Sequence, residues 1–126
     1  MNRKVLVADD SATIRMIVQA TLNAAGWDVV LAADGAQALD LARTHQPALV
    51  ITDWNMPVLD GPGLIAALRA EPALAALPVL VLTTEGDEQV YAQARALGVQ
   101  GWLGKPVEPE TLVAVVADFL PLSSKA

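Results

Sequence analysis

The sequence predicts a doubly wound α/β domain, which is a parallel β-sheet with helices on both of its faces. Short runs rich in Val, Leu and Ile alternate along the chain with longer segments whose apolar residues recur at helical spacing. The short runs are also nearly continuous in apolar residues, which is typical of strands buried on both faces. Strict alternation of strand and helix requires right-handed crossovers, and five strands with five helices follow.

The expected strands are short and apolar, and the first four are rich in β-branched residues and leucine. They occupy residues 5–8, 29–32, 49–52, 79–83 and 101–103. Parallel strands of this kind need a crossover segment between each pair, and the chain provides one helical segment after every strand.

The expected helices are marked by apolar stripes within residues 14–25, 38–42, 64–68, 90–97 and 112–120. Ser11 is the predicted N-cap of the first helix, and Gly26 is its predicted terminator. Pro72 limits the third helix, Gly98 ends the fourth and Pro109 begins the fifth.

The length of 126 residues suits one domain with a single hydrophobic core. We expect this domain at residues 1–121, followed by a tail at 122–126. No apolar run approaches the roughly 20 residues of a membrane span, and the N-terminal stretch is too short and too acidic for a secretory signal. A cytoplasmic protein without membrane insertion is therefore expected. The absence of cysteine excludes disulfides and thiolate chemistry.

The formal net charge is -6, and the 8 Lys and Arg residues are scattered along the chain. Nucleic-acid binding requires clustered cations that displace counterions from phosphates, so we expect no nucleic-acid partner. The acidity itself is an ordinary means of keeping a protein soluble.

Polar residues stand at the carboxyl ends of four expected strands. Asp9 and Asp10 follow the first strand, Asp53 follows the third, Thr83 completes the fourth and Lys105 lies just after the fifth. Ligands of open α/β sheets bind at this edge, near the place where the strand order reverses. We therefore expect these side chains to converge on one site.

Three carboxylates in one pocket repel one another, by on the order of 4 kcal/mol per pair at about 4 Å and an effective dielectric near 20. A hard cation with oxygen ligands offsets this repulsion, and Mg²⁺ is the natural candidate. Asp10 and Asp53 are predicted to be direct ligands, and Asp9 is predicted to ligate directly or through water. The backbone carbonyl of Asn55 is expected to complete the protein's share of the ligands.

Asp53 is also predicted to be the nucleophile that accepts a phosphoryl group. Because negative charge spreads over the equatorial oxygens in that transition state, a cation opposite the metal is useful, and Lys105 supplies it. The Thr83 hydroxyl can donate to a further phosphoryl oxygen, so its movement can report the event.

Taken together, these residues resemble the receiver domain of two-component response regulators, and within that family the free-standing CheY-type chemotaxis regulators. The resemblance covers the whole chain and rests on four segments that match in order and spacing. They are Val7-Ala8-Asp9-Asp10-Ser11, Asp53-Trp54-Asn55-Met56-Pro57 with Asp60-Gly61, Thr83-Thr84-Glu85, and Lys105-Pro106. The resemblance implies the flavodoxin-like strand order 2-1-3-4-5 and phosphorylation of Asp53 by a histidine kinase.

The resemblance further implies a switch that connects Thr83 with Trp102 and alters the face formed by helix four, strand five and helix five. Asn55 and Glu85 occupy positions that tune dephosphorylation in the family. The implied partners are the kinase, a downstream target such as the flagellar motor or pilus machinery, and a phosphatase. Trp102 has an alternative interpretation with similar weight, as an ordinary packing residue at a strand end.

Other interpretations stay open where single residues are concerned. Asp9 and Asp10 alone fit a helix N-terminus, and Lys105 alone fits a solvated surface cation. Only their joint placement with Asp53 and Thr83 favours the site. The alternative functions are a phosphate sink or adaptor in a phosphorelay and a phosphohydrolase of the haloacid dehalogenase type. The latter needs a second aspartate two residues after the nucleophile, where this chain has Asn55, so we expect a signalling domain and not an enzyme.

Overall fold

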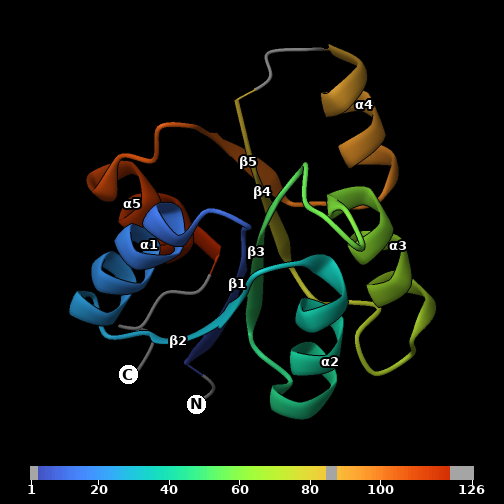
Figure 1. The fold of residues 1–126 in the computed structure, drawn as a ribbon, viewed down its shortest axis with the longest axis horizontal. Helices are drawn as coiled ribbons and strands as arrows, with labels where there is room; N and C mark the ends of the chain where they lie inside the picture. The colour runs from blue at the N-terminus through green and yellow to red at the C-terminus, as the bar shows by residue number, and fades with distance from the viewer. Residues whose placement is uncertain (1–2, 85–87, 120–126) are drawn as a thin grey trace.

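The computed structural model describes residues 3–84 and 88–119, with the side chain of Phe119 left aside. Strands and helices alternate along the whole of this part of the chain (Figure 1). The strands are β1 (Lys4–Ala8), β2 (Asp28–Ala32), β3 (Leu49–Asp53), β4 (Val79–Thr83) and β5 (Gly101–Gly104). The helices are α1 (Ala12–Ala24), α2 (Gly35–His45), α3 (Gly61–Ala70), α4 (Glu88–Ala96) and α5 (Pro109–Phe119).

The strands form one parallel sheet in the order β2-β1-β3-β4-β5. The chain moves outward from β1 to β2 and then returns to place β3 on the other side of β1, so the strand order reverses between β1 and β3. Strands β3 and β4 are buried along their full length, as the apolar runs predicted, whereas the edge strands β2 and β5 are partly exposed. The predicted fold class and strand order are confirmed.

Two apolar cores lie on the two faces of the sheet. One is shared with α1 and α5 and includes Val18, Leu22 and Leu112. The other is shared with α2, α3 and α4, and Leu64 and Ala94 belong to it. Figure 1 shows the same division, with α1 and α5 on one side of the sheet and the other three helices opposite.

The local signals in the sequence place the ends of the helices correctly. Ser11 caps α1 by accepting the backbone N–H of Ile14 at 3.3 Å. Gly26 and Gly98 have φ values of 100° and 78°, in the positive-φ region that glycine adopts at the end of a helix without the steric cost of a side chain. Pro109 is the first residue of α5. Four of the expected strands extend one residue further in the structure, and 79–83 matches β4.

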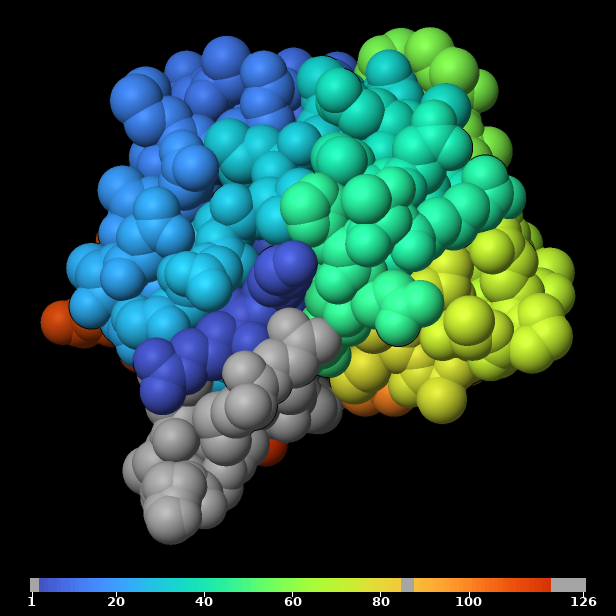
Figure 2. Space-filling model, turned by 90° about the horizontal axis from the view of Figure 1, so that it is seen from below, coloured from blue at the N-terminus to red at the C-terminus, as the bar shows by residue number. Residues whose placement is uncertain are grey.

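The site predicted from the sequence and the turns that lead from each helix into the next strand lie at opposite edges of the sheet. Figure 2 shows the molecule from the edge where the strands begin, with the turns that lead into β2, β3 and β4 in light blue, green and yellow. The carboxyl ends of the strands lie at the other edge, at the top of Figure 1. Among the described residues, no helix has the length and apolarity that crossing a membrane requires. The predicted tail at 122–126 lies outside the described residues.

Candidate functional site

The sheet brings the predicted site residues to its carboxyl edge. Asp9 and Asp10 directly follow β1, and Asp53 is the last residue of the neighbouring strand β3. Thr83 ends β4, where it lies opposite Gly104 of β5, and Lys105 comes next in the chain. In-register pairing of parallel strands therefore places residues that are almost a hundred positions apart beside one another.

Lys105 joins two of the acids. Its Nζ lies 2.9 Å from Asp9 Oδ2 and 3.2 Å from Asp53 Oδ1, and only 16% of its side chain is exposed. Carboxylate oxygens of Asp9, Asp10 and Asp53 all lie within 4.8 Å of one another. The structure thus brings the three acids and the amine together in the arrangement that the sequence predicts.

Asp9 is completely buried, and three of its polar groups are held by neighbouring segments. Its backbone N–H donates to the carbonyl of Ala32 at 3.1 Å, and its Oδ1 accepts the backbone N–H of Ser11 at 2.9 Å. Its carbonyl accepts a hydrogen bond from Arg15 Nη1 at 2.7 Å. Asp9 Oδ2 faces Lys105 closely, but no partner within the described residues offers it a well-directed hydrogen bond.

The positive charge of Lys105 offsets the negative charges of Asp9 and Asp53 only in part. Burial, together with the nearby charge of Asp9, raises the pKa of Asp53 despite the opposing effects of Lys105 and the backbone of Asn55. Burial alone would lower the pKa of Lys105, but its contacts with Asp9 and Asp53 outweigh burial and raise it. The ionised carboxylate of Asp53 therefore lies in an environment that does not fully stabilise it.

These observations fit a divalent cation with a preference for oxygen. The cluster combines three carboxylates with one amine, and two of the acids are almost wholly buried. A buried carboxylate oxygen without a well-directed hydrogen bond, that of Asp9, points into the same cluster. Asp10 is exposed, so one side of the cluster is open to solvent and to an incoming group. The donor set is the one that Mg²⁺ prefers.

The loop between β3 and α3 is packed closely against the site. The Gly61 N–H donates to the carbonyl of Trp54 at 2.9 Å, and a Cβ at position 61 would lie 2.6 Å from the carbonyl oxygen of Asp53. Only glycine allows α3 to begin this near the end of β3. Asn55 lies in this loop, exposed, two residues beyond Asp53.

Thr83 and Trp102 project from the same face of the sheet, toward α4. Val81 of β4 pairs with Trp102 of β5, and Thr83 follows two residues later, so strand alternation gives all three the same orientation. Thr83 is buried, whereas Trp102 is partly buried against the core on the α4 side. Glu85, the other residue predicted in this region, lies outside the described residues.

Sequence reasoning missed three side chains that contact these site residues. The Tyr91 ring of α4 stacks on Trp102 with centroids 4.5 Å apart and planes inclined by 14°. The Arg95 guanidinium carbon lies 5.8 Å from the centre of the same ring. Their spacing of four residues on α4 was the available signal, because it places both on one helix face. Arg15, which holds the carbonyl of Asp9, appeared in the sequence only as one of several scattered cations.

The family model described as "Response regulator receiver domain" matches residues 5–117 of this chain. The chain belongs to the response regulator receiver family. Receiver domains act in two-component signalling, so the class of protein predicted from the sequence is confirmed. The acidic cluster of Asp9, Asp10 and Asp53 lies within the matched residues.

Individual receiver proteins are similar to this chain over nearly its full length. A chemotaxis protein CheY homolog of Campylobacter jejuni is 39% identical over 123 residues, covering 96% of this chain and 95% of that protein. The structure of the Vibrio cholerae chemotaxis protein CheY4 has 40% identity and a TM-score of 0.91, covering 95% of this chain and 100% of the other. A response regulator from Burkholderia multivorans is 51% identical with a TM-score of 0.78, covering 94% of each chain.

Proposed function

We propose that this protein is a phosphorylation switch that receives a phosphoryl group from a histidine kinase on Asp53. The observation that carries the proposal is the position of Lys105 Nζ, 2.9 Å from Asp9 and 3.2 Å from Asp53, at the edge of a receiver fold. This geometry supports the proposal because it gathers a carboxylate that can act as a nucleophile, a cation and an acidic cluster that can hold a metal around one point.

In the proposed reaction, a carboxylate oxygen of Asp53 attacks phosphorus while the bond from phosphorus to the donor imidazole breaks. Lys105 favours the ionised form of Asp53, and its ammonium group lies where it can neutralise a phosphoryl oxygen. Asp9, Asp10, Asp53 and the backbone carbonyl of Asn55 would hold Mg²⁺, which supplies charge neutralisation at the phosphoryl oxygens when bound.

Thr83 and Trp102 are proposed to carry the signal away from the site. The Thr83 hydroxyl would turn toward a phosphoryl oxygen, and the space that it leaves would favour an inward position of Trp102. The stack with Tyr91 and the nearby Arg95 favour the present position of the indole ring. The switch would therefore exchange these contacts on α4 for burial against β4, altering the surface of α4, β5 and α5.

The proposal also covers the removal of the phosphoryl group and the partner proteins. Asn55 and Glu85 are proposed to influence how rapidly water removes the phosphoryl group, alone or with a phosphatase. In this proposal the protein catalyses only its own phosphorylation and dephosphorylation, in the cytoplasm. The similarity to chemotaxis proteins supports a target in motility, such as flagellar or pilus machinery.

The proposal is tested by labelling the purified protein with acetyl phosphate and Mg²⁺ and measuring its intact mass. We expect one phosphoryl group on the wild type and none on Asp53→Asn. Asp34→Asn is the matched control, because Asp34 caps α2 and takes no part in the acidic cluster. A labelled Asp53→Asn variant would contradict the assignment of the phosphoacceptor.

A second measurement separates a signalling switch from a phosphate sink. Candidate motility targets are tested for binding with and without beryllofluoride, which mimics the phosphoryl group. A switch should gain target affinity with the mimic, and the gain should disappear in the Thr83→Ala variant. Phosphorylation without any such gain would favour the phosphate sink.

A further inference from the structure

Arg15 makes a contact with the acidic cluster that helix formation does not explain. It is the one charged residue in α1, and it lies near the N-terminal end of that helix. A cation there is unfavourable toward the helix dipole. Its side chain bends back past the start of the helix, and Nη1 donates to the carbonyl oxygen of Asp9 at 2.7 Å.

The contact fixes the last backbone group of Asp9 that would otherwise be unrestrained. The N–H of Asp9 is bound to the carbonyl of Ala32, and its Oδ1 is bound to the N–H of Ser11. With Arg15 on the carbonyl, the peptide that connects Asp9 to Asp10 is held from the helix side as well. The orientation of this peptide sets the direction in which the Asp10 side chain leaves the backbone, next to the buried carboxylate of Asp9.

We propose that Arg15 is a positioning residue of the metal site, which keeps the carboxylates of Asp9 and Asp10 aimed at the same point as that of Asp53. This inference rests on the proposed Mg²⁺ site. The charge of Arg15 acts in the opposite direction, because a guanidinium near the cluster repels a bound cation. The sign of the change in affinity after removing Arg15 therefore distinguishes positioning from simple electrostatics.

The test is a calorimetric titration of the full chain with Mg²⁺ alone. We expect Arg15→Met to weaken Mg²⁺ binding by about ten-fold or more, as loss of a partner that orients metal ligands does. Arg15→Gln keeps a donor but not the reach of arginine, so it should weaken binding as well. If Arg15→Met does not fold, the same comparison is made with Arg15→Gln.

Arg69→Met is the matched control. Arg69 also uses its guanidinium to hold backbone carbonyls, those of Leu77 at 2.7 Å and Gly98 at 2.9 Å, near the opposite edge of the sheet. Its loss should lower the melting midpoint and leave the Mg²⁺ affinity unchanged. If Arg69→Met weakens Mg²⁺ binding as much as Arg15→Met does, the effect is general loosening and the inference is overturned.

The remaining outcomes separate the inference from the function on which it rests. Unchanged or tighter Mg²⁺ binding by Arg15→Met would overturn the positioning role, but it would not contradict the proposed metal site. Failure of the wild-type chain to bind Mg²⁺ would overturn the metal site and this inference together. A parallel fluorescence titration provides a second readout, because the buried Trp54 directly follows Asp53.

Discussion

Helices α1 and α4 lie on opposite faces of the sheet, and the structure holds them very differently. Helix α1 buries Val18 and Leu22 completely and has Ser11 as its N-cap. In its described length, α4 buries only Ala94, and its aromatic residue Tyr91 is partly exposed in the stack with Trp102. The helix that follows Asp9 and Asp10 is therefore anchored, and the helix beside the proposed switch is weakly packed.

This difference separates the two tasks of a receiver domain. Metal and phosphoryl binding require ligands that stay in place, and in the proposed function the segment from β1 into α1 would provide two of them, Asp9 and Asp10. A switch requires an element whose alternative positions differ little in free energy, and elements with few buried apolar contacts supply it. The comparison predicts that perturbations on the α1 side act on stability and metal binding, whereas those on the α4 side act on the transmitted signal.

The largest expected effect on stability comes from truncating the anchored side. Leu22→Ala removes a fully buried side chain from the core shared with α5, so we expect it to lower the free energy of unfolding by about 3 kcal/mol. Val90→Ala on α4 removes a partly buried side chain, so its expected cost is about 1 kcal/mol. Urea denaturation of both variants measures the two costs. Similar losses for the two would contradict the proposed difference between the helices.

An intermediate effect on stability is expected from replacing Asp53 in the site, and this effect should depend on pH. Because the pKa of Asp53 is raised in the folded state, its ionised form opposes folding when no metal is present. Asp53→Asn should therefore raise the melting midpoint by a few degrees at pH 7 in the presence of a chelator. The gain should shrink as pH falls through the raised pKa and vanish below about 3.9, where the carboxyl group is protonated in both states.

Excess Mg²⁺ provides the control for this prediction. The metal should stabilise the wild type and leave Asp53→Asn nearly unaffected. The difference in melting midpoint between the two proteins at pH 7 should therefore become smaller or change sign. If Asp53→Asn is less stable than the wild type when no metal is present, the prediction is wrong, and Lys105 already offsets the negative charge of the acids.

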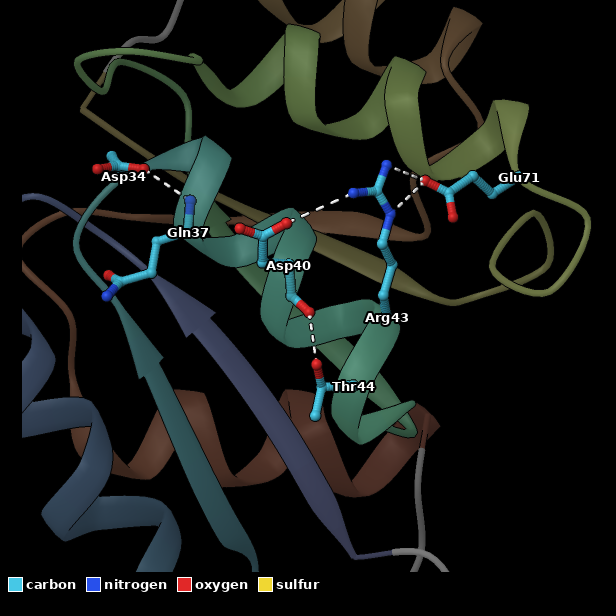
Figure 3. A network of polar contacts seen from close by, with 6 residues as sticks. All are labelled: Asp34, Gln37, Asp40, Arg43, Thr44 and Glu71. Carbon is cyan, nitrogen blue, oxygen red and sulfur yellow. Dashed lines mark hydrogen bonds and ion pairs between the residues drawn. The ribbon is translucent and has the colours of Figure 1, made fainter.

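The smallest effect is expected far from the site, at the surface contact between α2 and the end of α3 (Figure 3). Arg43 Nε donates to Glu71 Oε2 at 2.8 Å, and this contact lowers the pKa of Glu71. The stabilising contribution is therefore present above the ordinary value near 4.3 and is lost as pH falls through the lowered pKa. Glu71→Gln should lower the melting midpoint slightly at pH 7 and leave it unchanged at low pH.

A double-mutant comparison checks that the effect belongs to the pair. In an Arg43→Gln background, Glu71→Gln should have no further effect, and high salt should reduce the effect of the single variant. If Glu71→Gln lowers the melting midpoint at pH 7 equally in the Arg43→Gln background and at high salt, the effect does not come from the ion pair.

The fold and the convergence of Asp9, Asp53 and Lys105 could be predicted because they depend on patterns that a sequence displays. Buried parallel strands read as apolar runs, and a residue that follows such a run must lie at the carboxyl edge of the sheet. Ser11, Gly26 and Gly98 were found for a similar reason, since caps depend on local residue type.

The contacts of Arg15, Tyr91 and Arg95 could not be predicted in the same way. Each depends on the rotamer of a long or aromatic side chain and on the distance between elements, which spacing along the chain does not specify. The extent to which the charges of Asp9, Asp53 and Lys105 offset one another could not be predicted either. It depends on how deeply each group is buried, which the sequence does not show.

The central claim, that a rigid α1 side holds the site and a weakly packed α4 side transmits its state, is tested most directly by hydrogen exchange with and without beryllofluoride and Mg²⁺. Slow exchange in α1 under both conditions, with a change concentrated in α4 and β5, is the predicted result. A change centred on α1, or one spread evenly over all five helices, would contradict it.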